Sequence, residues 1–157
     1  MPDGELVVAD TSPLLNVALI GRLDLLREQF DGVTAPEQVW DELAAGDDGL
    51  DDPRALRDEG FLELVPVEES SLFVELRREL DRGEAAALAY AIDADADLVL
   101  LDERDARRVA RRHDRSVTGV IGVLLRAAER DRIDLRDALD RLRVEGSGSP
   151  TNCITTC

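Results

Sequence analysis

Two short apolar runs, each ending in an aspartate, constrain the fold of this chain most. Residues 97–102 (DLVLLD) hold four consecutive aliphatic residues between two aspartates. An unbroken run of this kind is typical of a central parallel strand that helices cover on both faces. Residues 6–9 form a second run, which ends at Asp10 and leads directly into a helix-like stretch. Each run therefore predicts a buried strand that brings a carboxylate to the edge of a sheet.

Strand and helix signals alternate along the rest of the chain. Besides strands at 5–9 and 97–102, the sequence predicts strands at 32–35, 61–65 and 116–118. Helices are predicted at 13–20, 22–30, 36–45, 53–59, 71–81, 84–93, 104–113, 120–130 and 134–144. Thr11 or Ser12 is the expected cap of the first helix, and Gly83 the expected break before helix 84–93. This alternation predicts an α/β fold, a three-layer α/β/α sandwich around a mainly parallel sheet of about five strands.

The length and the polar ends of the chain indicate one domain. We expect it to span residues 1–145, and we expect the low-charge tail 146–157 to be disordered. The chain contains no run of about 18 apolar residues, so no membrane span is expected. Its first ten residues contain no basic segment, so no signal peptide is expected and a cytoplasmic location is the default prediction.

The charge of the chain is extreme, with a formal net charge of -16. All 19 basic residues are Arg, because the chain contains no Lys. An acidic surface without Lys suggests a halophilic host, such as a halophilic archaeon, whose salty cytoplasm screens the self-repulsion. The alternative is a GC-rich genome that favours Arg codons, although this explains the missing Lys better than the excess of acids.

The missing residue types exclude several chemistries. Without Lys the chain has no Walker A lysine and no Schiff-base lysine. His113 is the only histidine, which excludes a zinc site with several His ligands. Cys153 and Cys157, both in the last five residues, do not make a disulfide framework.

Acidic residues recur where the predicted strands end and the predicted helices begin. They are Asp10, Glu42, Glu84, Asp102 and Asp105. Carboxylates that converge at the carboxyl edge of a parallel sheet repel one another unless a divalent cation binds them, and Mg²⁺ or Mn²⁺ is the hard ion that prefers oxygen ligands. Such an ion activates a bound water against a phosphodiester. Ser12 is a candidate for positioning that water or a ligand.

Each of these acids also has an ordinary structural explanation. In so acidic a chain a single Asp or Glu is most often a surface residue. Glu84 could simply complement the helix dipole, and Asp105 could be a helix cap. Glu42 could lie on a solvent-exposed face, as could the neighbouring candidate Glu37. Asp10 and Asp102 are the strongest members because both directly follow apolar strands.

At these residues the chain resembles the PIN-domain family, which includes VapC-type toxins. The resemblance covers residues 6–130 and is carried by segments 7–21 (VVADTSPLLNVALIG), 35–43 (APEQVWDEL), 82–110 and 117–127 (VTGVIGVLLRA). It implies a Mg²⁺- or Mn²⁺-dependent single-strand endoribonuclease, possibly the toxin of a toxin–antitoxin pair. By position it implies catalytic roles for Asp10, Glu42, Glu84 and Asp102, with Asp10, Glu84, Asp102 and Asp105 as metal ligands. PIN toxins commonly have Asp where this chain has Glu84.

An arginine-rich helix follows Asp102 and offers contacts to RNA phosphates. Arg104, Arg108, Arg111 and Arg112 share one broad face at helical spacing. The alternative is that these arginines pair with surface acids or with an acidic partner.

Two further alternatives remain open from the sequence. The apolar helices 13–20 and 22–30 could form the face of a homodimer, as in many PIN proteins, or could be core. The chain could also be a catalytically inactive PIN-like module that binds RNA or an antitoxin protein. A haloacid-dehalogenase-like phosphatase is disfavoured, because it needs a second Asp where this chain has Ser12 and a Lys that the chain lacks.

Overall fold

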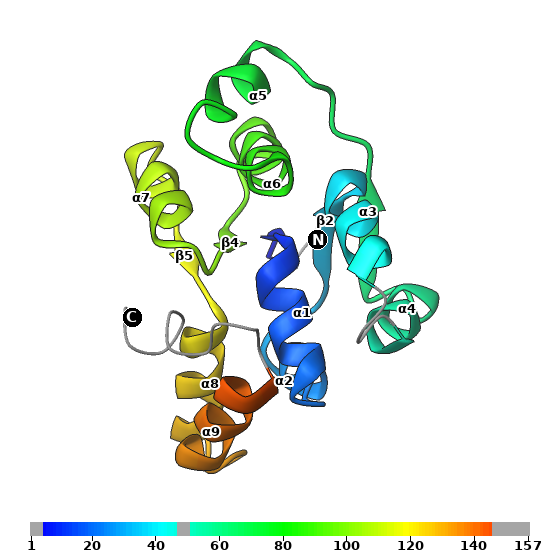
Figure 1. Cartoon of the computed structure of the whole chain (residues 1–157), viewed down its shortest axis with the longest axis vertical. Coiled ribbons are helices and arrows are strands. Elements are labelled where there is room, and N and C mark those ends of the chain that lie inside the picture. Colours follow the sequence, from blue (N-terminus) through cyan, green and yellow to red (C-terminus); the bar gives the residue numbers. More distant parts are fainter. Residues whose placement is uncertain (1–4, 47–50, 146–157) are drawn as a thin grey trace.

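The computed structural model describes residues 5–46 and 51–145 (Figure 1). Its core is a five-stranded parallel sheet with the strand order β3-β2-β1-β4-β5. The strands are β1 (Val7–Ala9), β2 (Val33–Pro36), β3 (Leu62–Val65), β4 (Leu98–Leu100) and β5 (Val117–Thr118). The predicted parallel α/β fold is confirmed.

Helices connect the strands and cover the sheet. In chain order they are α1 (Thr11–Leu19), α2 (Asp24–Gln29), α3 (Glu37–Gly46), α4 (Asp51–Asp58), α5 (Ser71–Leu76), α6 (Arg82–Ala94), α7 (Arg104–Arg112), α8 (Val120–Glu129) and α9 (Leu135–Glu145).

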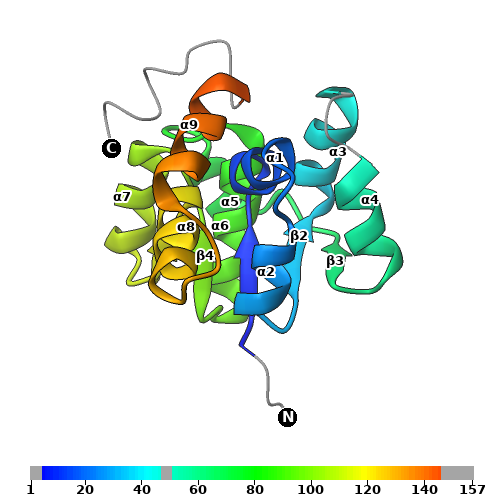
Figure 2. The same cartoon turned by 90° about the horizontal axis from the view of Figure 1, so that it is seen from below.

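The sheet separates two hydrophobic clusters, because its side chains alternate between the two faces. Val7, Ala9 and Leu100 pack with apolar residues of α1–α4, α8 and α9. Val8 and Val99 face the other way, toward α5, α6 and α7. Figure 2 shows α1 and α2 on one side of the strands and α5 and α6 on the other. The predicted three-layer arrangement is confirmed.

The strand order also fixes where a ligand can approach. From β1 the chain moves outward through β2 to β3, then crosses back to β4 and β5 on the other side of β1. The carboxyl ends of β1 and β4 therefore flank the point at which the connections change direction, and open parallel sheets bind ligands there. Ala9 pairs with Leu100, and the Asp10 N–H donates to the Leu100 carbonyl at 3.1 Å. Asp10 and Asp102 thus follow adjacent strands at one edge of the sheet.

The predicted elements agree with the observed ones in type and order, with three local corrections. Asp10, not Thr11 or Ser12, is the N-cap residue of α1. Helix α5 ends at Leu76, earlier than predicted. Gly83 is not a break but lies inside α6, because the preceding Asp81 caps that helix.

Two predictions concern the chain ends and the membrane. The predicted disorder of residues 146–157 lies outside the described residues. Over residues 5–46 and 51–145, no helix combines the length and apolar character that crossing a bilayer requires.

Candidate metal centre

Asp10 is the buried centre of the acidic edge. It follows β1 and caps α1 by position, yet its side chain makes no capping hydrogen bond to the helix. Only 4% of the residue is exposed. Within the described part of the chain, its Oδ1 atom has no hydrogen-bond partner. A buried carboxylate oxygen without a donor is costly, so this atom is suited to bind a positively charged ligand.

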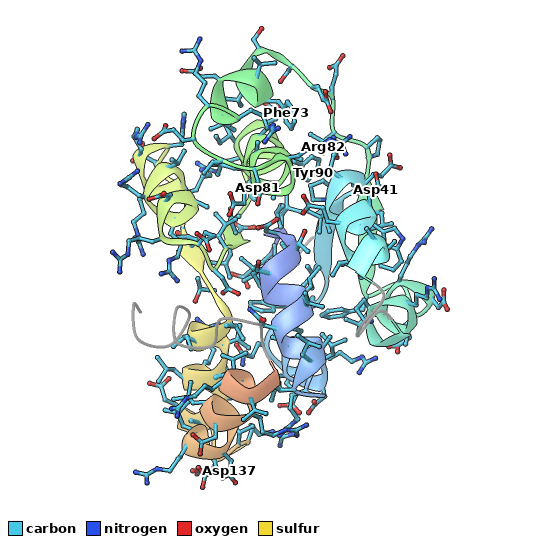
Figure 3. The ribbon with its side chains drawn as sticks, viewed as in Figure 1. Asp41, Phe73, Asp81, Arg82, Tyr90 and Asp137 are labelled. Carbon is cyan, nitrogen blue, oxygen red and sulfur yellow. The ribbon has the colours of Figure 1, made fainter. Side chains whose placement is uncertain are left out.

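Glu42 and Asp81 complete a group of three carboxylates with Asp10. Glu42 comes from α3, and Asp81 immediately precedes α6, where Figure 3 shows it between α6 and α1. One carboxylate oxygen from each of the three residues lies within 4.8 Å of the others. Three elements far apart in sequence therefore converge at the end of β1.

Thr11 holds the Glu42 side chain in this arrangement. The Thr11 hydroxyl donates to Glu42 Oε1 at 2.6 Å. Because Thr11 begins α1 and is adjacent to Asp10, this hydrogen bond links the ends of β1 and α3. It fixes one Glu42 oxygen and reduces the rotamer freedom that binding would otherwise remove.

Gly83 allows the carboxylates to come this close to α6. A Cβ atom at Gly83 would lie 2.4 Å from Glu42 Oε1 and 3.0 Å from Asp10 Oδ1. Any larger residue here would displace at least one of these carboxylates. Gly83 thus leaves the space that the two oxygens occupy.

Glu84 lies beside this group but uses one oxygen for the helix cap. Its Oε1 accepts the Asp81 N–H at 3.0 Å, while Asp81 Oδ1 accepts the Glu84 N–H at 2.8 Å. This reciprocal capping box fixes the start of α6. Burial, with the nearby carboxylates of Asp81, Glu103 and Glu42, raises the pKa of Glu84 to about 7. Glu84 is therefore poised to change charge near neutral pH.

The same environment acts more strongly on Asp10. Burial raises the pKa of Asp10 well above its ordinary value, and the negative charges of Glu84, Asp81 and Glu42 add to this effect. The nearby backbone N–H of Thr11 opposes this rise in the pKa. A cation bound at these carboxylates would favour the ionised form of Asp10 and so oppose this rise in the pKa.

Asp102 occupies the same edge but has a different environment. Its Oδ1 accepts the Val120 N–H at 2.7 Å, and its Oδ2 accepts from Asn16 Nδ2 at 3.0 Å. Burial raises the pKa of Asp102, while these two donors and the nearby Arg107 guanidinium oppose the rise. Both oxygens of Asp102 are thus hydrogen-bonded, in contrast to Oδ1 of Asp10.

The two secondary candidates from the sequence lie outside the group of three. Asp105 is exposed at the start of α7, where its Oδ1 lies 3.5 Å from the Arg108 guanidinium. Ser12 is adjacent to Thr11, but the hydroxyl that contacts Glu42 is that of Thr11. The structure therefore brings together Asp10, Glu42 and Asp81, with Glu84 adjacent and Asp102 on the neighbouring strand.

The arginines predicted to bind RNA lie on α7, where Arg108 and Arg112 pair with a surface carboxylate. Arg112 donates twice to Glu79, at 3.0 and 3.3 Å, and Arg108 lies 3.9 Å from the same carboxylate. Arg104 and Arg111 are also exposed on this helix. For Arg108 and Arg112 the structure shows the alternative considered from the sequence, pairing with surface acids.

Sequence reasoning missed three residues of this edge. Asp81 could have been found, because Asp81 and Glu84 have the D-x-x-E spacing of a capping box. Asn16 is the only polar residue of the predicted helix 13–20, which is a weak signal. Thr11 gave no signal beyond its place after Asp10, because its contact lies 31 residues away.

The residues of this group fit a hard divalent cation. The ligand atoms that Asp10, Glu42 and Asp81 offer are all carboxylate oxygens, and none comes from His or Cys. Among the described residues, Asp10 Oδ1 is buried without a hydrogen-bond partner. Mg²⁺ and Mn²⁺ prefer such ligands, whereas zinc prefers nitrogen and sulfur. Asp10, Glu42 and Asp81 are thus the residues best placed to hold the ion.

Comparison with known proteins agrees with this geometry. A family described as PIN domain (DUF3368) matches residues 6–154. Among curated proteins, none matches the chain. The PIN family typically comprises metal-dependent nucleases, and its match extends over nearly the whole chain. The resemblance predicted from the sequence is confirmed, and the chain belongs to the PIN domain family.

Proposed function

We propose that this protein is a Mg²⁺- or Mn²⁺-dependent endoribonuclease that cleaves single-stranded RNA. Two observations of one group of carboxylates carry the proposal. Asp10 Oδ1 is buried with no hydrogen-bond partner among the described residues, and one oxygen each of Asp10, Glu42 and Asp81 lie within 4.8 Å of one another. Membership of the PIN family supports the same reaction class.

In this proposal the residues at the carboxyl edge either bind the ion or position the residues that bind it. Asp10, Glu42 and Asp81 would hold the ion, Thr11 orients Glu42, and Glu84 fixes Asp81 through the capping box. When bound, the ion supplies an activated water and stabilises charge that develops on the phosphate. Because the carboxyl groups must be ionised to bind a cation, the raised pKa values of Asp10 and Glu84 make binding weaker as the pH falls.

The test measures cleavage of a mixed pool of single-stranded RNA in molar KCl, with Mn²⁺, Mg²⁺ or chelator. Wild type is compared with Asp10→Asn, and Asp137→Asn serves as the matched control. Asp137 is exposed on α9, at the far end of the molecule from Asp81 in Figure 3. We expect metal-dependent cleavage by wild type and by the control, and a loss of at least about 10²-fold in Asp10→Asn.

Two results would refute the proposal. One is cleavage by Asp10→Asn at the wild-type rate. The other is a folded wild type that binds Mn²⁺ but cleaves no RNA.

The second result would favour an inactive module that binds RNA or an antitoxin. The observation that favours this alternative is the engagement of Glu84 in the helix cap, which leaves it one free oxygen. A toxin role, an antitoxin partner and a homodimer are further proposals that follow from the resemblance to VapC-type toxins. Growth arrest on expression of wild type, but not of Asp10→Asn, would support the toxin role.

A further inference from the structure

Arg107 is an arginine of α7 whose guanidinium lies near Asp102 at the carboxyl edge of the sheet. A Cβ atom at Gly119 would lie 3.4 Å from Arg107 Nη1 and 2.5 Å from Asp102 Oδ1. The guanidinium and the Asp102 carboxylate therefore approach the same backbone point, which only a glycine leaves open. The face predicted from the sequence did not include Arg107, because helical spacing alone gives no information about this approach.

The guanidinium of Arg107 has hydrogen-bonding capacity to spare. Each oxygen of Asp102 already accepts a hydrogen bond, Oδ1 from the Val120 N–H and Oδ2 from Asn16 Nδ2. Arg107 is only partly exposed, and its side chain forms no hydrogen bond or ion pair within the residues that the structure describes. By contrast, Arg108 and Arg112 of the same helix pair with Glu79. A half-buried guanidinium whose N–H donors make no bond to the described protein residues is well suited to a planar, bidentate anion contact.

Arg107 belongs to the same electrostatic environment as the acidic group. The carboxylate of Glu103 raises the pKa of both Glu84 and Asp102, so both carboxyl groups lie within its range. Asp10 and Asp102 follow the adjacent strands β1 and β4. The cation beside Asp102 and the carboxylates around Asp10 therefore share one edge of the sheet.

We propose that Arg107 is a catalytic residue whose guanidinium contacts the non-bridging oxygens of the scissile RNA phosphate. This inference rests on the proposed nuclease function. Asp102, held by Asn16 and the N-terminus of α8, keeps the guanidinium in place by attraction without occupying its donors. A phosphate gains negative charge on these oxygens during attack, so the contact stabilises the transition state more than the bound substrate.

The experiment compares wild type with Arg107→Ala, Arg107→Lys and the control Arg136→Ala, which removes an exposed arginine of α9. Steady-state cleavage of a fluorescent single-stranded RNA is measured with Mn²⁺ in molar KCl, and Mn²⁺ affinity and thermal stability are measured on the same samples. Each variant is then assayed with added guanidinium ion at concentrations that do not unfold the protein. Asp10→Asn is included to test the proposed function itself.

We expect kcat to fall by about 10²-fold in Arg107→Ala with little change in KM, Mn²⁺ affinity or thermal stability. Added guanidinium should restore part of this loss. Arg107→Lys should be less active than wild type, because the Lys ammonium keeps the positive charge but cannot make the planar, bidentate contact. A wild-type kcat in Arg107→Ala, or a loss that guanidinium does not restore, would overturn this inference while the wild type stays active. An inactive wild type, or an active Asp10→Asn, would instead refute the nuclease function on which it rests.

Discussion

The capping residue Glu84 offers a direct test of the electrostatics at this edge. Replacement of Glu84 by Gln keeps an oxygen that accepts the Asp81 N–H, so the capping box survives. It removes a buried carboxyl group whose pKa is raised from 4.5 to about 7. Each pKa unit corresponds to about 1.4 kcal/mol, so fully ionised Glu84 costs the metal-free protein about 3–4 kcal/mol at most.

The sign of this effect depends on pH. A raised carboxyl pKa favours the folded protein while the group is protonated, below about pH 4.5, and this advantage is lost as the pH rises through about 7. Metal-free Glu84→Gln should therefore match wild type at about pH 4.5 and exceed its free energy of unfolding by up to about 3 kcal/mol at about pH 8. The assay is chemical denaturation in chelator and molar KCl across this pH range.

Glu79 offers a matched control, because its pKa is shifted in the opposite direction to that of Glu84. Glu79 is exposed, and its hydrogen bond with Arg112 lowers its pKa. Glu79→Gln should therefore be no more stable than wild type at neutral pH, and any deficit should disappear in acid. The reasoning fails if Glu84→Gln is less stable than wild type at about pH 8, or if the difference between them is independent of pH.

Two further substitutions test single contacts of the site. Gly83→Ala should gain up to about 1 kcal/mol of helix propensity. Its Mn²⁺ affinity should fall at least about tenfold, because the new Cβ would collide with Glu42 and crowd Asp10. Calorimetric titration measures the Mn²⁺ affinity, and an unchanged affinity would contradict this prediction. Asn16→Ala removes a donor from the partly buried Asp102 and should lower the free energy of unfolding at neutral pH by about 1–3 kcal/mol. A urea denaturation curve that coincides with the wild-type curve would show that this hydrogen bond contributes nothing.

The order of strands and helices was predictable because its signals are local. The run that ends at Asp102 was long and apolar enough to identify a central strand, and β4 is indeed buried between both helix layers. The errors also had local causes. Gly83 looked like a break because glycine is usually unfavourable inside helices. The cap at Asp81 places this position inside α6, and the close approach of Glu42 leaves no room for a Cβ atom there.

The candidate site was predictable only in part. Asp10 was identified because it follows a strand, and strands of a parallel sheet end at a common edge. Asp81 was passed over in favour of Glu84, although both lie at the start of α6. Which of two neighbouring carboxylates faces Asp10 depends on the rotation of α6 against α3 and β1, and no local pattern records this rotation.

The sequence by itself determined the alternation of strands and helices. It also determined that the strands before Asp10 and Asp102 end at a common edge of the sheet, and that this edge is acidic. These features depend on periodicity and strand ends, which neighbouring residues specify. Only the tertiary structure decided which carboxylate oxygens have N–H donors. Asp102 Oδ2 receives a donor from Asn16 across 86 residues, whereas Asp10 Oδ1 receives none from the described residues, and the Asp10 carboxylate lies beside Glu42 and Asp81. The physical reason is that hydrogen bonds and charge repulsion act through space, so their partners are fixed only when distant segments pack together.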